Sequence, residues 1–139
     1  MTLSIRHLAA TTALALAVSS AAAPAAWARS SGTEKTLKMV DTDKDGTIDL
    51  KEAQAAAEAT FDRAEKDKDS TVDTKELMGR LSRKDLKAAD ADNDGTLDKR
   101  EFLALVEQRF KAADPDNDGK IDAKELKSNA GKSLMQLLK

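Results

Sequence analysis

The sequence predicts an all-α fold, a compact helical bundle in which short shared helices join four copies of one acidic loop. Two observations favour this class. A 12-residue acidic pattern recurs at 41–52, 65–76, 90–101 and 114–125, and only 12 or 13 residues separate one copy from the next. In two of these spacers, apolar residues recur at offsets 0, 3, 4, 8 and 11. That spacing places them on one face of a helix.

Residues 1–28 are predicted to be a cleaved secretory signal peptide. A charged start with Arg6 and His7 precedes an apolar run from 8 to 18, and the segment ends in an A-x-A pattern at 26–28. This order is typical of signal peptides, and an 11-residue run is too short to anchor a chain in a bilayer. We therefore expect a periplasmic protein with no membrane anchor.

The composition of the remaining chain restricts its chemistry. Cleavage after Ala28 leaves 111 residues with 22 basic and 25 acidic side chains, a net charge of −3, and no Cys, His, Trp or Tyr. This excludes zinc-finger, disulfide and thiol chemistry and the usual catalytic His and Cys, so we expect neither an enzyme nor a nucleic-acid partner. Only 20 of the 111 residues are Leu, Ile, Val or Phe. Something besides apolar burial must therefore help the chain to fold.

The acidic residues occupy fixed positions in the repeated loops. Each copy has carboxylates at positions 1, 3, 5, 9 and 12, so the four copies hold 20 of the 25 acidic residues. The pattern resembles the EF-hand calcium loop, in which these side chains and the position-7 carbonyl surround a hard cation. A glycine at position 6 permits the sharp turn of that loop, and three copies have it, as Gly46, Gly95 and Gly119.

The candidate metal ligands follow from this pattern. In the first, third and fourth loops they are Asp41, Asp43, Asp45, Thr47, Asp49, Glu52, Asp90, Asp92, Asp94, Thr96, Asp98, Glu101, Asp114, Asp116, Asp118, Lys120, Asp122 and Glu125. The second loop is expected to bind more weakly, through Glu65, Asp67, Asp69, Thr71, Asp73 and Glu76. Its Glu65 replaces Asp at position 1, and Ser70 replaces Gly at a position where a positive φ costs about 1 kcal/mol or more.

Position 8 argues against a merely solvated acidic surface, which is the usual explanation of a run of Asp and Lys. This position holds Ile48, Val72, Leu97 and Ile121 in the four loops. Paired EF-hand loops make a short two-stranded contact there, with the side chains facing the core. The pattern therefore favours four paired metal loops.

The spacers set the predicted architecture. A 12-residue helix is roughly 18 Å long, so one shared helix holds its two loops at opposite ends. Gly79 and Ser82 interrupt the helical pattern between loops two and three, where we expect a turn. Loop one should then pair with loop four, and loop two with loop three. The segment 29–40 should hold a short entering helix, and 41–139 the four-loop domain.

Several residues have specific structural roles in this prediction. Ser82 and Asp85 resemble a helix capping box, and Pro115 should end the preceding helix. The C-terminal tail should add an apolar face that is broken around 129–131. The predicted core faces are Ala53, Ala56, Ala57, Phe61 and Ala64, then Phe102, Leu105, Val106, Phe110 and Ala113, then Ala123, Leu126, Leu134, Leu137 and Leu138.

With the signal peptide and the short spacers, the strings DKDGTIDLKEA, DNDGTLDKREF and PDNDGKIDAKEL and the ending AGKSLMQLLK resemble the lanmodulin family of periplasmic lanthanide-binding proteins. The resemblance implies that Asp41, its partners in loop one and their equivalents in loops three and four bind trivalent rare-earth ions in preference to calcium. It also implies lanthanide-handling periplasmic partners and a role connected with lanthanide-dependent methanol dehydrogenases. The family often has Pro at loop position 2, where only Pro115 matches.

Spacing and charge alone leave the ion open, because Ca²⁺ also relieves the repulsion between clustered carboxylates. A periplasmic calcium buffer or sensor is therefore the alternative, and a docking module made rigid by calcium is a third reading. Only Met39, Met78 and Met135 follow the signal peptide, too few for a Met-rich target groove.

Overall fold

The computed structural model describes residues 32–139. The predicted signal peptide, residues 1–28, lies outside this part. The predicted all-α class is confirmed, because helices carry nearly all of the regular structure from 32 to 139. The helices are α1 (Gly32–Val40), α2 (Leu50–Ala64), α3 (Arg83–Ala89), α4 (Lys99–Ala113), the 3-10 helix η1 (Glu125–Lys127) and α5 (Asn129–Leu137). None of these helices is long and apolar enough to cross a membrane.

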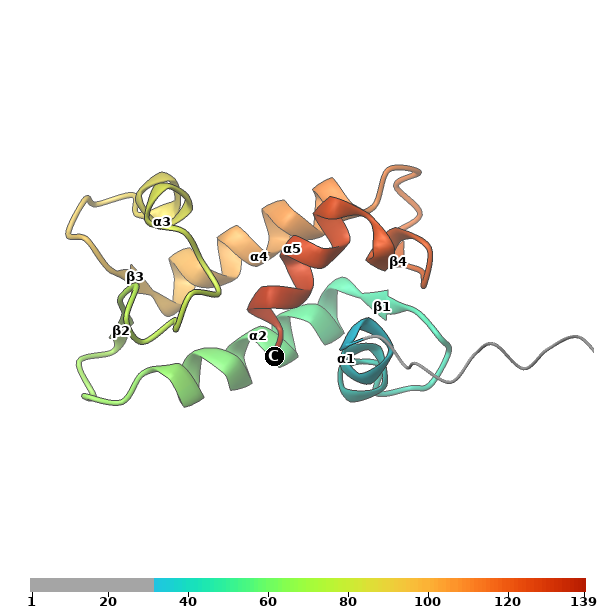
Figure 1. Cartoon of the computed structure of the whole chain (residues 1–139), viewed down its shortest axis with the longest axis horizontal. Coiled ribbons are helices and arrows are strands. Elements are labelled where there is room, and N and C mark those ends of the chain that lie inside the picture. The colour runs from blue at the N-terminus through green and yellow to red at the C-terminus, as the bar shows by residue number, and fades with distance from the viewer. Residues whose placement is uncertain (1–31) are drawn as a thin grey trace, which may run out of the picture.

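Two long helices form the centre of the molecule. The 15-residue helices α2 and α4 pack against each other, and α5 packs against α4 (Figure 1). Asp49 caps the start of α2 and Asp98 caps the start of α4, and both residues are at loop position 9. Each long helix therefore begins within one loop and ends at the next. This is the shared-helix arrangement that the short spacers predict.

Four two-residue strands join the loops in pairs. They are β1 (Ile48–Asp49), β2 (Thr71–Val72), β3 (Leu97–Asp98) and β4 (Lys120–Ile121). The strands β1 and β4 are antiparallel, as are β2 and β3, and the two pairs lie at opposite ends of the molecule (Figure 1). Loop one thus lies beside loop four, and loop two beside loop three, as expected from the spacers.

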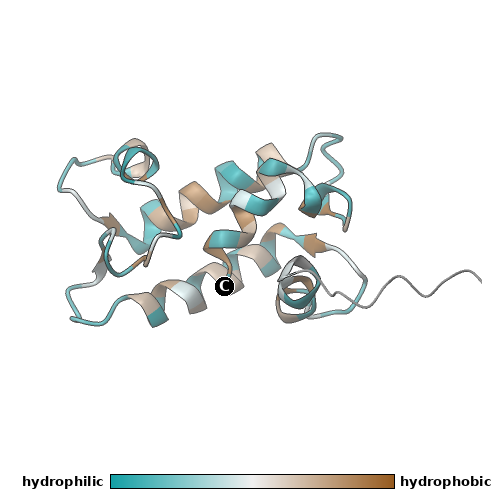
Figure 2. Cartoon of the chain, in the orientation of Figure 1, coloured by the Kyte–Doolittle hydropathy of each residue, from teal (hydrophilic) through white to brown (hydrophobic). Residues whose placement is uncertain are grey.

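The position-8 residues connect the loops to the core. All four are fully buried, with Ile48 opposite Ile121 and Val72 opposite Leu97. Each strand carries one apolar residue, while the loops around the strands are hydrophilic (Figure 2). Between α2 and α4, the rings of Phe61 and Phe102 lie 5.7 Å apart, centroid to centroid.

Nearly all of the predicted core faces are buried. On α2 the exception is Ala56, which is half-buried, while Thr60 is buried although its polarity did not suggest it. In the tail Ala123 is exposed, because the chain there belongs to the loop-four exit and precedes η1. The other predicted core residues of α4 and of the tail are buried.

The connection between loops two and three is a turn followed by α3. Gly79 has a φ of 78°, and the Met78 before it has a φ of 48°, so two consecutive residues are left-handed. Ser82 caps α3 by accepting the Asp85 N–H at 3.1 Å, as predicted. A full capping box would also have the Asp85 side chain accept the Ser82 backbone N–H. Here the Asp85 carboxylate accepts the Ser82 hydroxyl instead.

The break in the tail lies one residue before the predicted segment 129–131. Ser128 ends η1 and caps α5, and its hydroxyl oxygen accepts the Gly131 N–H at 2.9 Å. Gly131 is therefore in the first turn of α5. It is glycine because a Cβ there would collide with the Glu125 carbonyl oxygen, so close packing rather than a helix break explains it.

Candidate metal centre

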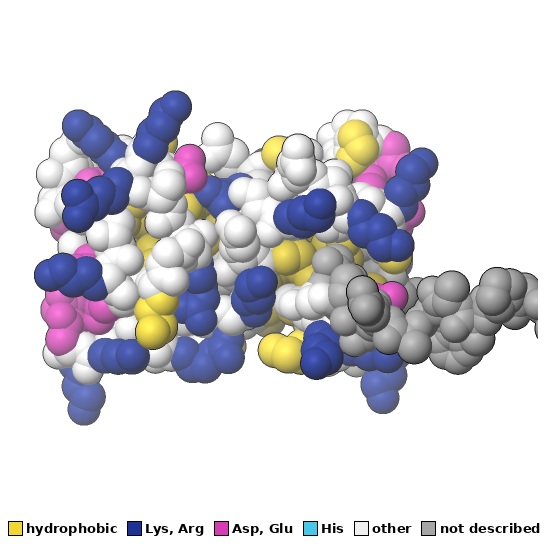
Figure 3. All heavy atoms as spheres, in the orientation of Figure 1, with side chains coloured by type: hydrophobic (Ala, Val, Ile, Leu, Met, Phe, Trp, Pro, Cys, Tyr) yellow, Lys and Arg dark blue, Asp and Glu magenta, His cyan; other side chains and the backbone are white. Residues whose placement is uncertain are grey.

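Each loop brings three carboxylates together. In every loop, oxygens from positions 1, 3 and 5 lie within 4.8 Å of one another. The groups are Asp41, Asp43 and Asp45, then Glu65, Asp67 and Asp69, then Asp90, Asp92 and Asp94, then Asp114, Asp116 and Asp118. Acidic side chains accordingly gather at both ends of the molecule (Figure 3). Hard oxygen donors at this density suit a multivalent hard cation.

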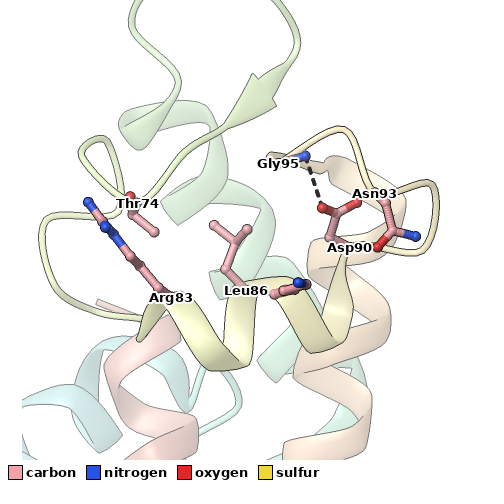
Figure 4. Close-up of a pocket in the computed structure, with 7 residues that line it drawn as sticks. Thr74, Arg83, Leu86, Asp90, Asn93 and Gly95 are labelled. Atoms are coloured by element: carbon pink, nitrogen blue, oxygen red, sulfur yellow. Dashed lines mark hydrogen bonds between the residues drawn. The ribbon is translucent and has the colours of Figure 1, made fainter.

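The position-1 carboxylate closes the turn of each loop. Asp90 accepts the Gly95 N–H at 2.9 Å, which Figure 4 shows as a dashed line, and its side chain points back into the loop. Loops one and four make the same bond at 3.0 Å, to Gly46 and to Gly119. The three glycines have φ values of 83° to 90°, a region that costs other residues energy. Gly at position 6 therefore permits this closure without backbone strain.

Loop two reaches the same closure under strain. Glu65 accepts the Ser70 N–H, but at 3.3 Å, and Ser70 has a φ of 71°. The longer side chain at position 1 thus makes a longer bond, and a residue with a Cβ occupies the left-handed position. Both features agree with the weaker second loop that the sequence predicts.

Position 4 carries a further strain that the sequence analysis missed. Lys44, Lys68, Asn93 and Asn117 have φ values of 62°, 65°, 61° and 56°. Asn tolerates the left-handed region better than Lys does, because its short side chain can bond locally. Loops three and four are therefore better preorganised than loops one and two. The presence of Lys or Asn at position 4 is the sequence feature that could have predicted this difference between the loops.

The acidic residues at positions 9 and 12 hydrogen-bond to each other, and they are not part of the carboxylate group formed by positions 1, 3 and 5. In loop one, Asp49 accepts the Glu52 N–H at 2.7 Å and Glu52 accepts the Asp49 N–H at 3.1 Å, a capping box at the start of α2. The same pair of bonds occurs in the other three loops. The structure therefore brings together three of the five predicted carboxylates. The other two bond each other's backbone N–H groups, and in loops one and three they begin the exit helices α2 and α4.

Position 2 also contacts the position-12 glutamate in three loops. Glu52 accepts the Thr42 N–H at 2.6 Å, and Glu101 accepts the Ala91 N–H at 2.8 Å. Glu76 does the same with Lys66 at 3.1 Å. In loop four Pro115 has no N–H to donate, so position 2 cannot make this hydrogen bond to Glu125.

The residues predicted to offer carbonyl ligands at position 7 are fixed by their neighbours at position 5. The Thr47 hydroxyl donates to Asp45 at 2.6 Å and its N–H donates at 2.8 Å, and Thr71 and Thr96 make the equivalent bonds. Lys120 donates its N–H to Asp118 at 2.8 Å but lacks the hydroxyl. Its ammonium instead reaches across to loop one and donates to Asp45 at 2.5 Å.

The EF hand family model matches residues 33–54, 84–106 and 105–128. These three segments contain loops one, three and four, and the matches leave out loop two. The chain fits an EF-hand metal-binding protein. No curated protein matches it.

Charge crowding shows in the pKa values of the acidic loops. At Asp67 the bond from the Asp69 N–H lowers the pKa, but burial and the charges of Asp69 and Glu76 outweigh it, so the pKa is raised above 3.8. Asp92 has a raised pKa for the equivalent reasons. Asp45 differs, because its bond to the Lys120 ammonium, then its bonds to Thr47, lower its pKa to about 2.

One atom of loop one tests whether an ion fits. The Oδ1 of Asp41 is buried and has no hydrogen-bond partner among residues 32–139, whereas the equivalent oxygens of Asp90 and Asp114 each accept an N–H at 3.2 Å. A buried carboxylate oxygen without a partner is costly, and a cation is the partner that its charge favours. The donor set of loop one therefore fits a metal ion.

Proposed function

We propose that this chain is a periplasmic EF-hand protein that binds trivalent lanthanide ions, folds on binding them and takes part in lanthanide uptake or handling. The proposal rests above all on one observation. Four groups of three carboxylates lie at the ends of helices that two loops share, so every long helix depends on ions at both ends. It follows that metal binding and folding are coupled.

Charge supports the choice of a trivalent ion. Two carboxylates about 5 Å apart repel by roughly 3 kcal/mol at an effective dielectric constant of 20, and each loop carries five. A trivalent ion relieves more of this repulsion than a divalent one. The raised pKa values of Asp67 and Asp92 are in keeping with crowded negative charge.

The resemblance to the lanmodulin family supports the same ion and the cellular role. It rests on the short spacers together with the loop strings, since the loop strings alone are shared with many calcium proteins. The predicted signal peptide supports the periplasm as the compartment. By the same resemblance, the partners are periplasmic proteins that handle lanthanides.

The second candidate is a periplasmic calcium buffer or sensor. The matches to the EF hand family model favour it, because those segments have the ligand pattern of calcium loops. Neither candidate requires catalysis, and we propose that the protein is not an enzyme.

The test is competitive titration of the mature chain, residues 29–139, with La³⁺ and with Ca²⁺ at buffered free-ion concentrations. We expect La³⁺ to bind far more tightly than Ca²⁺, whereas equal affinities would assign the protein to the calcium class. Replacing Asp49, Asp98 and Asp122 with Ser should narrow the gap between the two affinities, because it removes charge near the ion while Ser at 49 and 98 can still cap α2 and α4. The matched control replaces Glu34, Glu58 and Glu107 with Gln, which removes the same charge outside the loops.

A further inference from the structure

We infer that Lys120 is an internal competitor for the ion of loop one, so that a residue of loop four sets the affinity of its partner loop. This inference rests on the proposed metal binding and concerns its regulation within one loop pair. It starts from the ammonium of Lys120, which donates to the Oδ2 of Asp45 at 2.5 Å across the pair. Asp45 is one of the three carboxylates that loop one gathers.

The fold holds Lys120 in this place. Its Cα lies opposite Asp49 in the pairing of β4 with β1, next to the buried contact of Ile48 with Ile121. The backbone register therefore directs a position-7 side chain of loop four toward loop one. Its ammonium is attracted not only by Asp45 but also by the charges of Asp43 and Asp49, which help to raise the pKa of Lys120.

The other loop pair has no such cation at position 7. There Thr71 and Thr96 occupy the equivalent places, and each hydroxyl bonds the position-5 aspartate of its own loop. Loop one has this bond too, from Thr47, so Asp45 accepts both a hydroxyl and an ammonium. Loop four lacks the hydroxyl bond, since its position-7 residue is Lys120 itself.

A cation that enters loop one must compete with this ammonium. Asp45 can bind the ion fully only after its hydrogen bond with the Lys120 ammonium is broken. The positive charge of the ammonium also repels the ion. One unit charge several ångströms from a multivalent ion in a solvent-screened site changes affinity by roughly three- to tenfold. Loop one should therefore fill after loops three and four, although its sequence matches the EF-hand pattern as well as theirs.

The experiment follows each loop separately by NMR. The amide signals of Gly46, Gly95 and Gly119 report on loops one, three and four, because each N–H bonds the position-1 carboxylate of its loop. La³⁺ is diamagnetic, so these signals stay visible during a titration at buffered free La³⁺. The quantity to compare is the midpoint for Gly46 divided by the midpoint for Gly95, which lies in the other loop pair.

We expect Lys120→Thr, which installs the residue of the other three loops, to lower this ratio three- to tenfold. Lys120→Gln, which keeps the length of the side chain, should act in the same direction. Lys120→Arg should keep the native ratio, since it keeps the charge. Lys124→Thr is the matched control, because it removes one charge from loop four at a residue that makes no ion pair with loop one in the described part of the chain.

An unchanged ratio in Lys120→Thr and Lys120→Gln, or an equal shift in Lys124→Thr, would overturn the inference while leaving metal binding intact. A repeat with Ca²⁺ separates this outcome from failure of the proposed function. If the ratio shifts with Ca²⁺ and the protein binds La³⁺ no more tightly than Ca²⁺, the competitor role of Lys120 holds and the lanthanide assignment is wrong. If neither ion moves any of the three signals, both are wrong.

Discussion

Asp49 and Glu52 bond each other's backbone N–H groups, at 2.7 and 3.1 Å, across the boundary between loop one and α2. The last carboxylate of the loop is thus also the third residue of the helix. An ion that binds Glu52 would order the first turn of α2, and forming the first turn is the costly step of helix formation. The loops and helices of this protein are therefore coupled through their shared residues.

The first prediction separates the charge of Glu52 from its capping role. Glu52→Gln should remove one tight equivalent of metal, because position 12 loses its charge, while Gln can still accept the Asp49 N–H. Isothermal titration calorimetry measures the stoichiometry. Glu58→Gln, on the exposed side of α2, is the control and should leave the stoichiometry unchanged. Retention of all tight equivalents in Glu52→Gln would show that position 12 is not a ligand.

The second prediction concerns loop two. Its long Glu65 bond and left-handed Ser70 should weaken binding by about 1–3 kcal/mol, or roughly 5- to 150-fold. The unmodified protein should therefore show three tighter sites and a weak or absent fourth. Glu65→Asp with Ser70→Gly should bring the fourth close to the others by the same calorimetry. Four equally tight sites before any substitution would refute this ranking.

Most of the fold follows from local sequence patterns. The spacing of Ala53, Phe61, Phe102 and Phe110 identified the two core faces, and the spacer lengths limited each connection to one helix. These inferences succeed because loop chemistry and helical periodicity both depend on residues close together in sequence. The predicted break at 129–131 was wrong by one residue, since the chain breaks at Ser128. The sequence suggests a break at Gly131 because glycine often interrupts helices, whereas the structure shows that this glycine allows close packing against Glu125.

The candidate site was less predictable. Positions 1, 3 and 5 come together as the loop pattern requires, whereas Asp49 and Glu52 proved to be occupied in a capping box. The contact of Lys120 with Asp45 joins residues 75 positions apart. It depends on the register of β1 with β4, which no local pattern specifies.

The third prediction gives a pH dependence for the metal-free chain. Asp67 and Asp92 have raised pKa values, so the folded state binds more protons there than the unfolded state, and stability rises as pH falls toward 3.8. Asp45 has a pKa lowered to about 2, so its contribution is present above 3.8 and is lost between 3.8 and 2.

The helix content of the metal-free chain, measured by circular dichroism, should therefore pass through a maximum near pH 4. Asp67→Asn with Asp92→Asn should raise the helix content at neutral pH and flatten its rise on mild acidification. A helix content that falls steadily from pH 7 to pH 3 would contradict this prediction.

The fourth prediction tests the close approach in the tail. Gly131→Ala should destabilise the metal-loaded protein by about 1–3 kcal/mol, because the new Cβ meets the backbone of Glu125 and Leu126. The urea midpoint of the loaded protein measures this. Gly32→Ala is the matched control, since a Cβ at Gly32 would meet no atom of the described residues within 4 Å. Equal midpoints for the two variants would show that the tail packs differently.

The central claim is that trivalent ions fold this chain, and helix content as a function of buffered free ion tests it most directly. We expect the chelator-treated mature chain to have little helix and to gain it steeply at low-micromolar or lower free La³⁺, with Ca²⁺ required at far higher concentrations. Full helix content with a cooperative melt before any ion is added, or equal midpoints for La³⁺ and Ca²⁺, would contradict the claim.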